Sequence, residues 1–141
     1  MSETIRTLIQ SIASRLRVRP TVASLVPFIY LWCCSAKGNA VHLTVRKLCT
    51  YVLNMCNCPS NSSNVKARLN FLLSALVLLA KRNNMEDAVN IIEANRLIYV
   101  WSVDKLKQLL EKEFPEISEI VSLMNVDKNL VLGVLCEEVC K

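Results

Sequence analysis

Carboxylates are missing from most of the first half of this chain. Of the 12 acidic residues only Glu3 precedes residue 86, whereas 11 of the 17 basic residues lie in residues 1–83. Residues 1–83 therefore carry a net charge of +10, and residues 84–141 a net charge of −5. A surface normally mixes both signs, so this tract indicates a polyanionic partner such as nucleic acid or an anionic membrane. An ordinary basic, solvated face is the alternative.

Glycine and histidine are also scarce. The two glycines, Gly38 and Gly133, supply no phosphate-cradling loop, and His42 alone supplies neither a Cys–His catalytic signature nor a zinc motif. The carboxylates of the second half follow helix-surface spacing. We therefore expect no catalytic residues, no cofactor, no metal site and no small-molecule ligand. The composition, 52% hydrophobic and poor in turn residues, predicts a mainly α fold.

Long hydrophobic runs are absent as well. The apolar stretches at residues 22–36 and 71–80 hold about 15 and 10 residues, whereas a membrane-spanning helix needs about 20. The first stretch also lies farther from the N-terminus than the apolar part of a signal peptide. We therefore expect no membrane partner and a cytoplasmic protein, associated with the nucleoid if it binds DNA.

The seven cysteines form no CxxC motif. The sequence CNC at residues 56–58 and the pair Cys136 and Cys140, one helical turn apart, are the only candidate ligand pairs. We expect most of the cysteines to be small buried hydrophobic residues. One or two disulfides are the alternative, as in intracellular proteins of hyperthermophiles.

Apolar periodicity and capping residues predict a series of helices and one hairpin. The hairpin is predicted in residues 88–101, where two runs of β-branched or aromatic residues flank a three-residue connection; the alternative is a helix that continues through residue 95. Thr44 and Asp127 are expected to cap helices, and Pro115 to open one. The predicted helices cover residues 2–19, 21–36, 45–56, 62–83, 103–113, 115–126 and 128–139.

Residues 22–113 resemble the winged helix-turn-helix family of DNA-binding proteins. The sequence SSNVKARLNFLL is the most specific part, with a capped start and apolar Val65, Leu69 and Leu72. The preceding LTVRKLCTYVLN is similar to the first helix of the motif, and RLIYVWSVDKLKQLL is similar to the strand that leaves the wing and the closing helix. The turn MCNCPSN is longer than is usual in this family, and the wing is not strongly basic.

This resemblance implies a mainly α, winged-helix-like domain with one short β-hairpin and additional N- and C-terminal helices. We expect a basic amphipathic helix in residues 1–20, the winged-helix-like part in residues 21–113 and a helical extension in residues 114–141, together forming one compact domain. We also expect a homodimer, formed through the N-terminal helix or the helices after Pro115.

The helix predicted at residues 62–83 divides into two halves. Its first turns carry polar residues opposite an apolar stripe, whereas from Phe71 onward it is apolar on every side. We therefore expect the second half to be covered all round and the first half to project outward, as in helices that contact DNA bases. The alternative is an ordinary buried helix with solvated ends.

We predict a double-stranded DNA-binding protein, either a transcriptional regulator or an architectural factor. The alternative function is an all-helical interaction or assembly subunit of a nucleoprotein complex or virus, without direct base readout. The predicted DNA contacts comprise the start of this helix, the wing and basic residues elsewhere in the first half: Ser62, Ser63, Asn64, Lys66, Ala67, Arg68, Asn70, Arg46, Lys47, Arg96, Arg15, Arg17 and Arg19.

Overall fold

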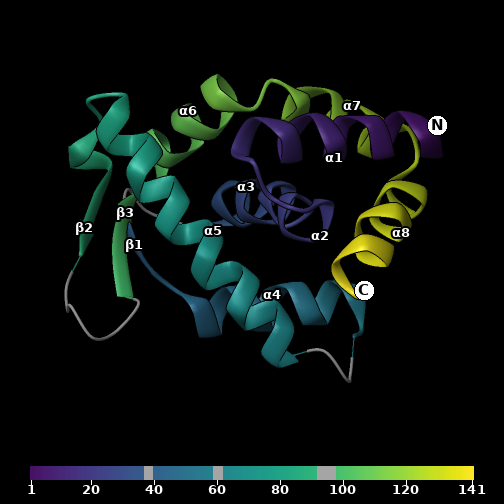
Figure 1. The fold of residues 1–141 in the computed structure, drawn as a ribbon, viewed down its shortest axis with the longest axis horizontal. Helices are drawn as coiled ribbons and strands as arrows, with labels where there is room; N and C mark the ends of the chain where they lie inside the picture. The colour runs from purple at the N-terminus through teal and green to yellow at the C-terminus, as the bar shows by residue number, and fades with distance from the viewer. Residues whose placement is uncertain (37–39, 59–61, 92–97) are drawn as a thin grey trace.

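The computed structural model describes residues 1–36, 40–58, 62–91 and 98–141. These residues form a group of helices with a small antiparallel sheet at one side (Figure 1). The predicted fold class, mainly α with a short hairpin, is confirmed. The elements are α1 (Ser2–Leu16), α2 (Pro20–Ala23), α3 (Val26–Ser35), β1 (Ala40–Thr44), α4 (Val45–Cys56), α5 (Ser62–Arg82), the short 3-10 helix η1 (Glu86–Ala88), β2 (Val89–Ile91), β3 (Ile98–Ser102), α6 (Val103–Glu113), α7 (Glu116–Val126) and α8 (Lys128–Val139).

The sheet has the strand order β1-β3-β2, and both pairings are antiparallel. Strands β2 and β3 are the predicted hairpin, with Val89 opposite Trp101. Strand β1 was not predicted; its Val41 lies opposite Trp101 on the other side. Because Trp101 is fully buried in the central strand, it fixes the sheet against the helices.

Side chains cap two helices as the sequence predicted. The Thr44 hydroxyl accepts a hydrogen bond from the Lys47 amide at 3.0 Å at the start of α4. The Asp127 carboxylate accepts one from the Leu130 amide at 3.1 Å at the start of α8. Each cap satisfies one amide that has no partner within its helix.

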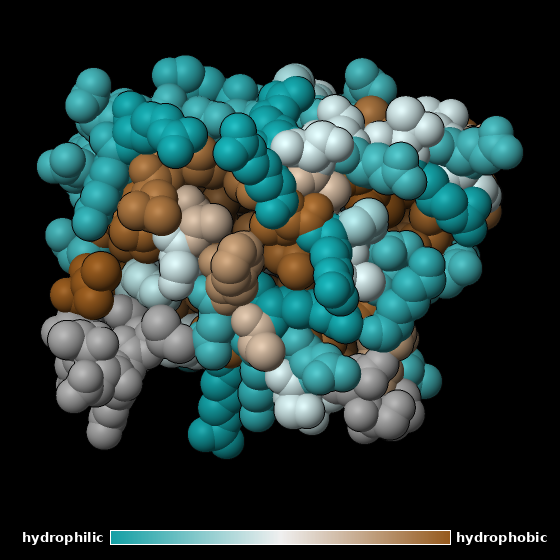
Figure 2. Space-filling view, viewed as in Figure 1, coloured by the Kyte–Doolittle hydropathy of each residue, from teal (hydrophilic) through white to brown (hydrophobic). Residues whose placement is uncertain are grey.

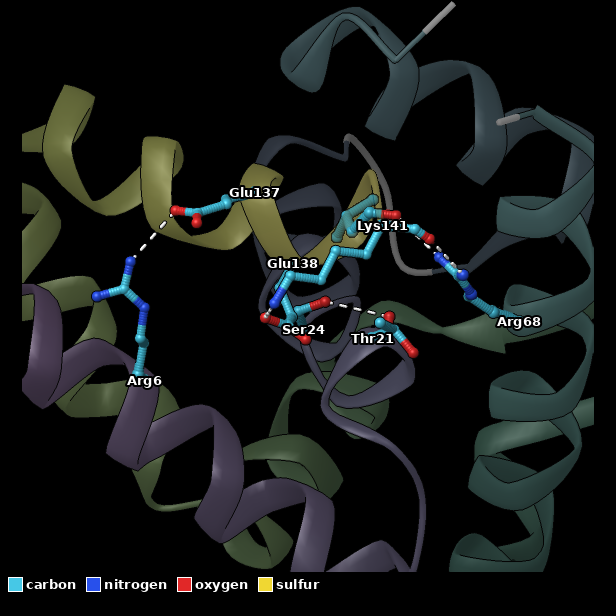
Figure 3. Close-up of polar contacts among 8 residues, drawn as sticks. Arg6, Thr21, Ser24, Arg68, Glu137, Glu138 and Lys141 are labelled. Atoms are coloured by element: carbon cyan, nitrogen blue, oxygen red, sulfur yellow. Dashed lines mark hydrogen bonds and ion pairs between the residues drawn. The ribbon is translucent and has the colours of Figure 1, made fainter. Parts of the chain in front are cut away.

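The single helix predicted at residues 21–36 is two helices, α2 and α3. Pro27 lies in the first turn of α3, where its missing N–H costs no helical hydrogen bond. At the break Ser24 is fully buried, and its hydroxyl donates to the Thr21 carbonyl at 3.2 Å (Figure 3). The proline therefore starts a new helix inside what looked like one apolar run.

One cluster of buried side chains joins residues from α1 through α8. The apolar stripe of α1 lies in this core and packs on α2, α7 and α8. The expected homodimer stays a prediction, but the N-terminal stripe that suggested it is buried within this chain.

The second half of α5 is not covered on every side. Val65, Leu69 and Leu76 are fully buried, yet Phe71 is 58% exposed and Leu78 is 62% exposed. The expectation that α5 is enclosed from Phe71 onward was therefore wrong. Figure 2 shows apolar side chains reaching the surface beside hydrophilic ones on the face where α5 lies.

By length and composition alone, α5 is the one helix of the described residues that could cross a membrane. Only 39% of its most apolar window is buried within the chain. Helix α1 and residues 20–35 meet the same criterion only as a pair bent by 104°. Core helices of water-soluble proteins share this length and composition.

The expectation that most cysteines are simply buried hydrophobic residues was wrong. Cys56 is bonded to Cys136, and Cys58 to Cys140. The two disulfides join the end of α4 and the turn that follows it to the last turns of α8. Three cysteines are free, of which Cys33 and Cys49 are buried and Cys34 is exposed.

Candidate nucleic-acid interface

The start of α5 presents a polar surface, and a buried side chain within it packs on the core. Ser62, Ser63, Asn64, Lys66 and Ala67 are all exposed. Val65, between them, is fully buried and holds this turn to the core. The first amides of any helix lack partners within it and carry a partial positive charge, to which Lys66 adds a full one. An anion such as phosphate is therefore favoured at this end.

Arg68 is engaged within the chain. Its guanidinium donates to the carbonyl of Val139 and to the carbonyl of Lys141, each at 2.9 Å (Figure 3). These bonds satisfy carbonyl groups at the end of α8, which have no helical partner. The predicted base contact thus also has a structural role, which sequence spacing could not reveal because the carbonyls lie more than 70 residues away.

Two ion pairs also involve residues at the end of α8. Arg6 of α1 donates to Glu137 at 3.2 Å, and Lys141 donates to Glu138 at 3.0 Å (Figure 3). The Arg6–Glu137 pair is largely solvent-exposed and contributes little stability by itself, whereas Glu138 is only 18% exposed and pairs with a residue three positions away. The Arg68 bonds hold the end of α8 beside the start of α5, whereas the Arg6 pair joins α8 to α1.

Asn70 is half-buried rather than displayed. Its side-chain oxygen is buried without a hydrogen-bond partner among the described residues. A buried amide oxygen in that state costs free energy that a donor would recover. Asn70 is therefore less accessible to a partner than the exposed residues Ser62, Ser63 and Asn64.

The remaining predicted basic residues lie at two other places. Arg46 and Lys47 are exposed on the first turn of α4. Arg17 and Arg19 are exposed after the end of α1, and Arg17 lies beside the second half of α5. Arg96 lies outside the described residues.

Arg15 is partly neutralised by the acidic half of the chain. It donates to the Glu113 carbonyl at 2.6 Å and to the Glu116 carboxylate at 3.1 Å. Glu116 is buried and also accepts a hydrogen bond from Ser11. This arginine therefore joins α1 to the start of α7, which limits its availability to phosphate.

Other acids of α6 also bond within the chain. Glu111 accepts a hydrogen bond from the Tyr30 hydroxyl at 2.8 Å, and Glu113 accepts one from the Asn83 amide at 2.7 Å. Burial and then Glu111 raise the pKa of Tyr30 well above its usual value. The acidic half is thus partly an internal counterpart to the basic half, through the pairs of Arg6 with Glu137 and of Arg15 with Glu116.

The buried free thiols are poor nucleophiles. Burial, with a smaller effect from Cys34, raises the pKa of Cys33 to about 12. Burial also raises the pKa of Cys49. Since the thiolate is the reactive form, neither thiol is activated near neutral pH.

Arg82 was not among the predicted contacts. This residue lies with Arg15 and Arg17 around a cavity between the end of α1 and the second half of α5. The signal was present in the spacing, because residues 71, 75, 78 and 82 fall on one face of a helix.

Comparison with protein-family models, with curated proteins and with solved structures finds no match to this chain.

Proposed function

We propose that this protein binds double-stranded DNA through the N-terminal turns of α5, as a transcriptional regulator or an architectural factor. The observation that carries the proposal is the exposed, cationic start of α5, held outward by buried Val65 and Leu69. A duplex major groove admits an α-helix whose first residues meet base edges and phosphates.

The order of the elements supports the same proposal. Helix α3 is followed by β1, α4, α5 and the hairpin β2–β3, and β1 pairs with β3. The winged-helix family that residues 22–113 resemble has the same order of helix pair and hairpin, with the second helix of the pair contacting DNA and the hairpin as the wing. Residues 92–97, the connection of the hairpin, lie outside the described structure, so the proposal rests on α5 rather than on the wing.

The residues take different roles in this proposal. Lys66 and Asn64, both exposed, contact bases or phosphates, while the hydroxyls of Ser62 and Ser63 donate to phosphate oxygens. Arg46 and Lys47 add phosphate contacts that carry no sequence information. Arg68 positions the end of α8 beside α5 instead of contacting a base.

A labelled duplex titrated at several salt concentrations tests the proposal. We expect tight binding at about 50 mM salt that weakens steeply as salt rises. Lys66→Gln should weaken binding and reduce the log–log salt slope by about 0.9, the loss of one phosphate contact. Lys112→Gln, which removes an exposed charge from α6, is the matched control and should leave the slope unchanged.

Two outcomes would contradict the proposal. Absence of binding at low salt would remove DNA as a partner altogether. Equal weakening by Lys66→Gln and Lys112→Gln would show that binding reflects total charge rather than the start of α5.

A further inference from the structure

The end of α1 and the second half of α5 enclose an open cavity of about 400 Å³. Ala75, Leu78 and Leu79 of α5 line one side, and residues 15–17 of α1 line the other. A volume of this size is within the range of small-molecule sites, which are mostly apolar with a few convergent polar groups. The start of α5 lies at the other end of a helix about 30 Å long, so this cavity is separate from the proposed DNA contacts.

The apolar side of the cavity is open to water. Leu78 is 62% exposed although it belongs to the longest helix of the fold, and Leu79 packs on the core from the same turn. Figure 2 shows apolar side chains at the surface between hydrophilic ones on this face. An apolar ligand body placed here would remove this surface from water, which is favourable.

Three arginines are among the residues that line the same cavity, namely Arg15, Arg17 and Arg82. Arg15 already bonds to Glu113 and Glu116. The side chains of Arg17 and Arg82 form no hydrogen bond or ion pair with any other residue that the structure describes. No carboxylate is among the described residues that line the cavity.

The negative ends of the two helices offset only part of the positive charge at the cavity. Both α1 and α5 end at the cavity, and each C-terminus carries about half a negative charge. Arg15 is paired with Glu116, but the two full charges of Arg17 and Arg82 exceed the charge of the two helix ends, so the cavity is left positive. Planar guanidinium groups match carboxylate and phosphate oxygens in paired hydrogen bonds.

We propose that this cavity binds a small amphiphilic anion, with a carboxylate or phosphate head at Arg17 and Arg82 and an apolar body against Leu78 and Leu79. The combination of charge and apolar lining distinguishes such a ligand from a DNA phosphate, which has no apolar body. A neutral apolar molecule, in contrast, would contact the leucines but would leave the arginines without an anionic partner.

Calorimetric titration with octyl phosphate and with octanoate, each below its micelle concentration, tests the proposal. At least one should bind saturably with one ligand per chain. Octanol and inorganic phosphate, which carry only one half of the chemistry, should each bind at least tenfold more weakly. The better of the two anionic probes shows whether the head group is phosphate or carboxylate.

Variants identify the site. Arg17→Gln with Arg82→Gln should weaken binding of the amphiphile roughly tenfold or more, since each paired guanidinium contact to an anion is lost. Lys112→Gln with Lys128→Gln removes the same charge from exposed positions of α6 and α8 and should leave affinity unchanged. All four side chains are exposed, so both double variants should keep the thermal unfolding midpoint of the native chain.

The proposal is overturned if inorganic phosphate binds as well as octyl phosphate, or if the two double variants lose affinity equally. Binding to phosphatidylglycerol vesicles without binding to either soluble probe would also overturn it, because the partner would then be a membrane surface. None of these measurements contains DNA, so the outcome is independent of the proposed DNA binding.

Discussion

Breaking the two disulfides singly and together tests how α8 is held against the helix pair α4 and α5. Cys56 and Cys136 are 80 residues apart, and Cys58 and Cys140 are 82 residues apart. The two loops enclose almost the same residues. Either bond alone therefore closes nearly the whole large loop, and the second bond closes only a small ring made of residues 56–58 and 136–140.

The chain-entropy model gives different free energies to the two steps. Closing a loop of about 80 residues stabilises the fold by about 4.5 kcal/mol at 25 °C, and closing a ring of about eight residues adds about 2.5 kcal/mol. Removing either disulfide should therefore cost about 2.5 kcal/mol, whereas removing both should cost about 7 kcal/mol. The double loss then exceeds the sum of the single losses by about 2 kcal/mol.

The assay is reversible unfolding by heat or denaturant under non-reducing conditions. The variants are Cys56→Ala with Cys136→Ala, Cys58→Ala with Cys140→Ala, and all four changes together. At about 2–4 °C per kcal/mol, the single losses should lower Tm by about 5–10 °C and the combined loss by about 15–25 °C. Cys34→Ala, at an exposed free cysteine, is the control and should change Tm little.

Reduction gives a second measurement without mutation. The native chain in excess dithiol reductant should unfold near the midpoint of the fourfold variant. Additive single and double losses would refute the nested-loop reasoning, and a fourfold variant as stable as the native chain would refute the disulfides themselves.

Two further predictions concern ionisable side chains. Lys105, by hydrogen bonding and by its charge, lowers the pKa of Asp87, so this pair stabilises the fold above the ordinary aspartate pKa and the contribution is lost as pH falls. Between pH 5 and pH 3 the native chain should therefore lose stability more steeply than Lys105→Gln in denaturant titrations; parallel losses would contradict this. A thiol reagent at pH 8 should react rapidly with Cys34 alone, and with Cys33 and Cys49 only after unfolding, because both are buried with raised pKa values. Three fast-reacting thiols in the folded chain would contradict the burial.

The helices were predictable where their signals are local. Thr44 and Asp127 cap α4 and α8 as expected, because a cap needs only a short polar side chain and an amide three residues ahead. The hairpin was also predictable, since its two strands are neighbours in sequence. Strand β1 was missed because its five residues acquire a partner only in β3, almost 60 residues later.

The candidate site was predictable only in part. The exposed start of α5 follows from its apolar stripe, which leaves Lys66 and Asn64 on the outside. The bonds of Arg68 to the end of α8 and of Arg15 to α7 do not follow from any pattern, because they depend on how distant helices pack. The same packing left Leu78 exposed, although the surrounding sequence is apolar on every side.

The sequence by itself determined the helical character of this protein, its capped helix starts and the division into a basic and an acidic half. These properties depend on composition and on residues three or four positions apart. Tertiary structure alone decided which arginines stay free, which cysteines pair and where an apolar cavity opens beside Arg82. The physical reason is that contacts between residues 70 to 80 positions apart are selected by the packing of the whole core, which no local pattern encodes.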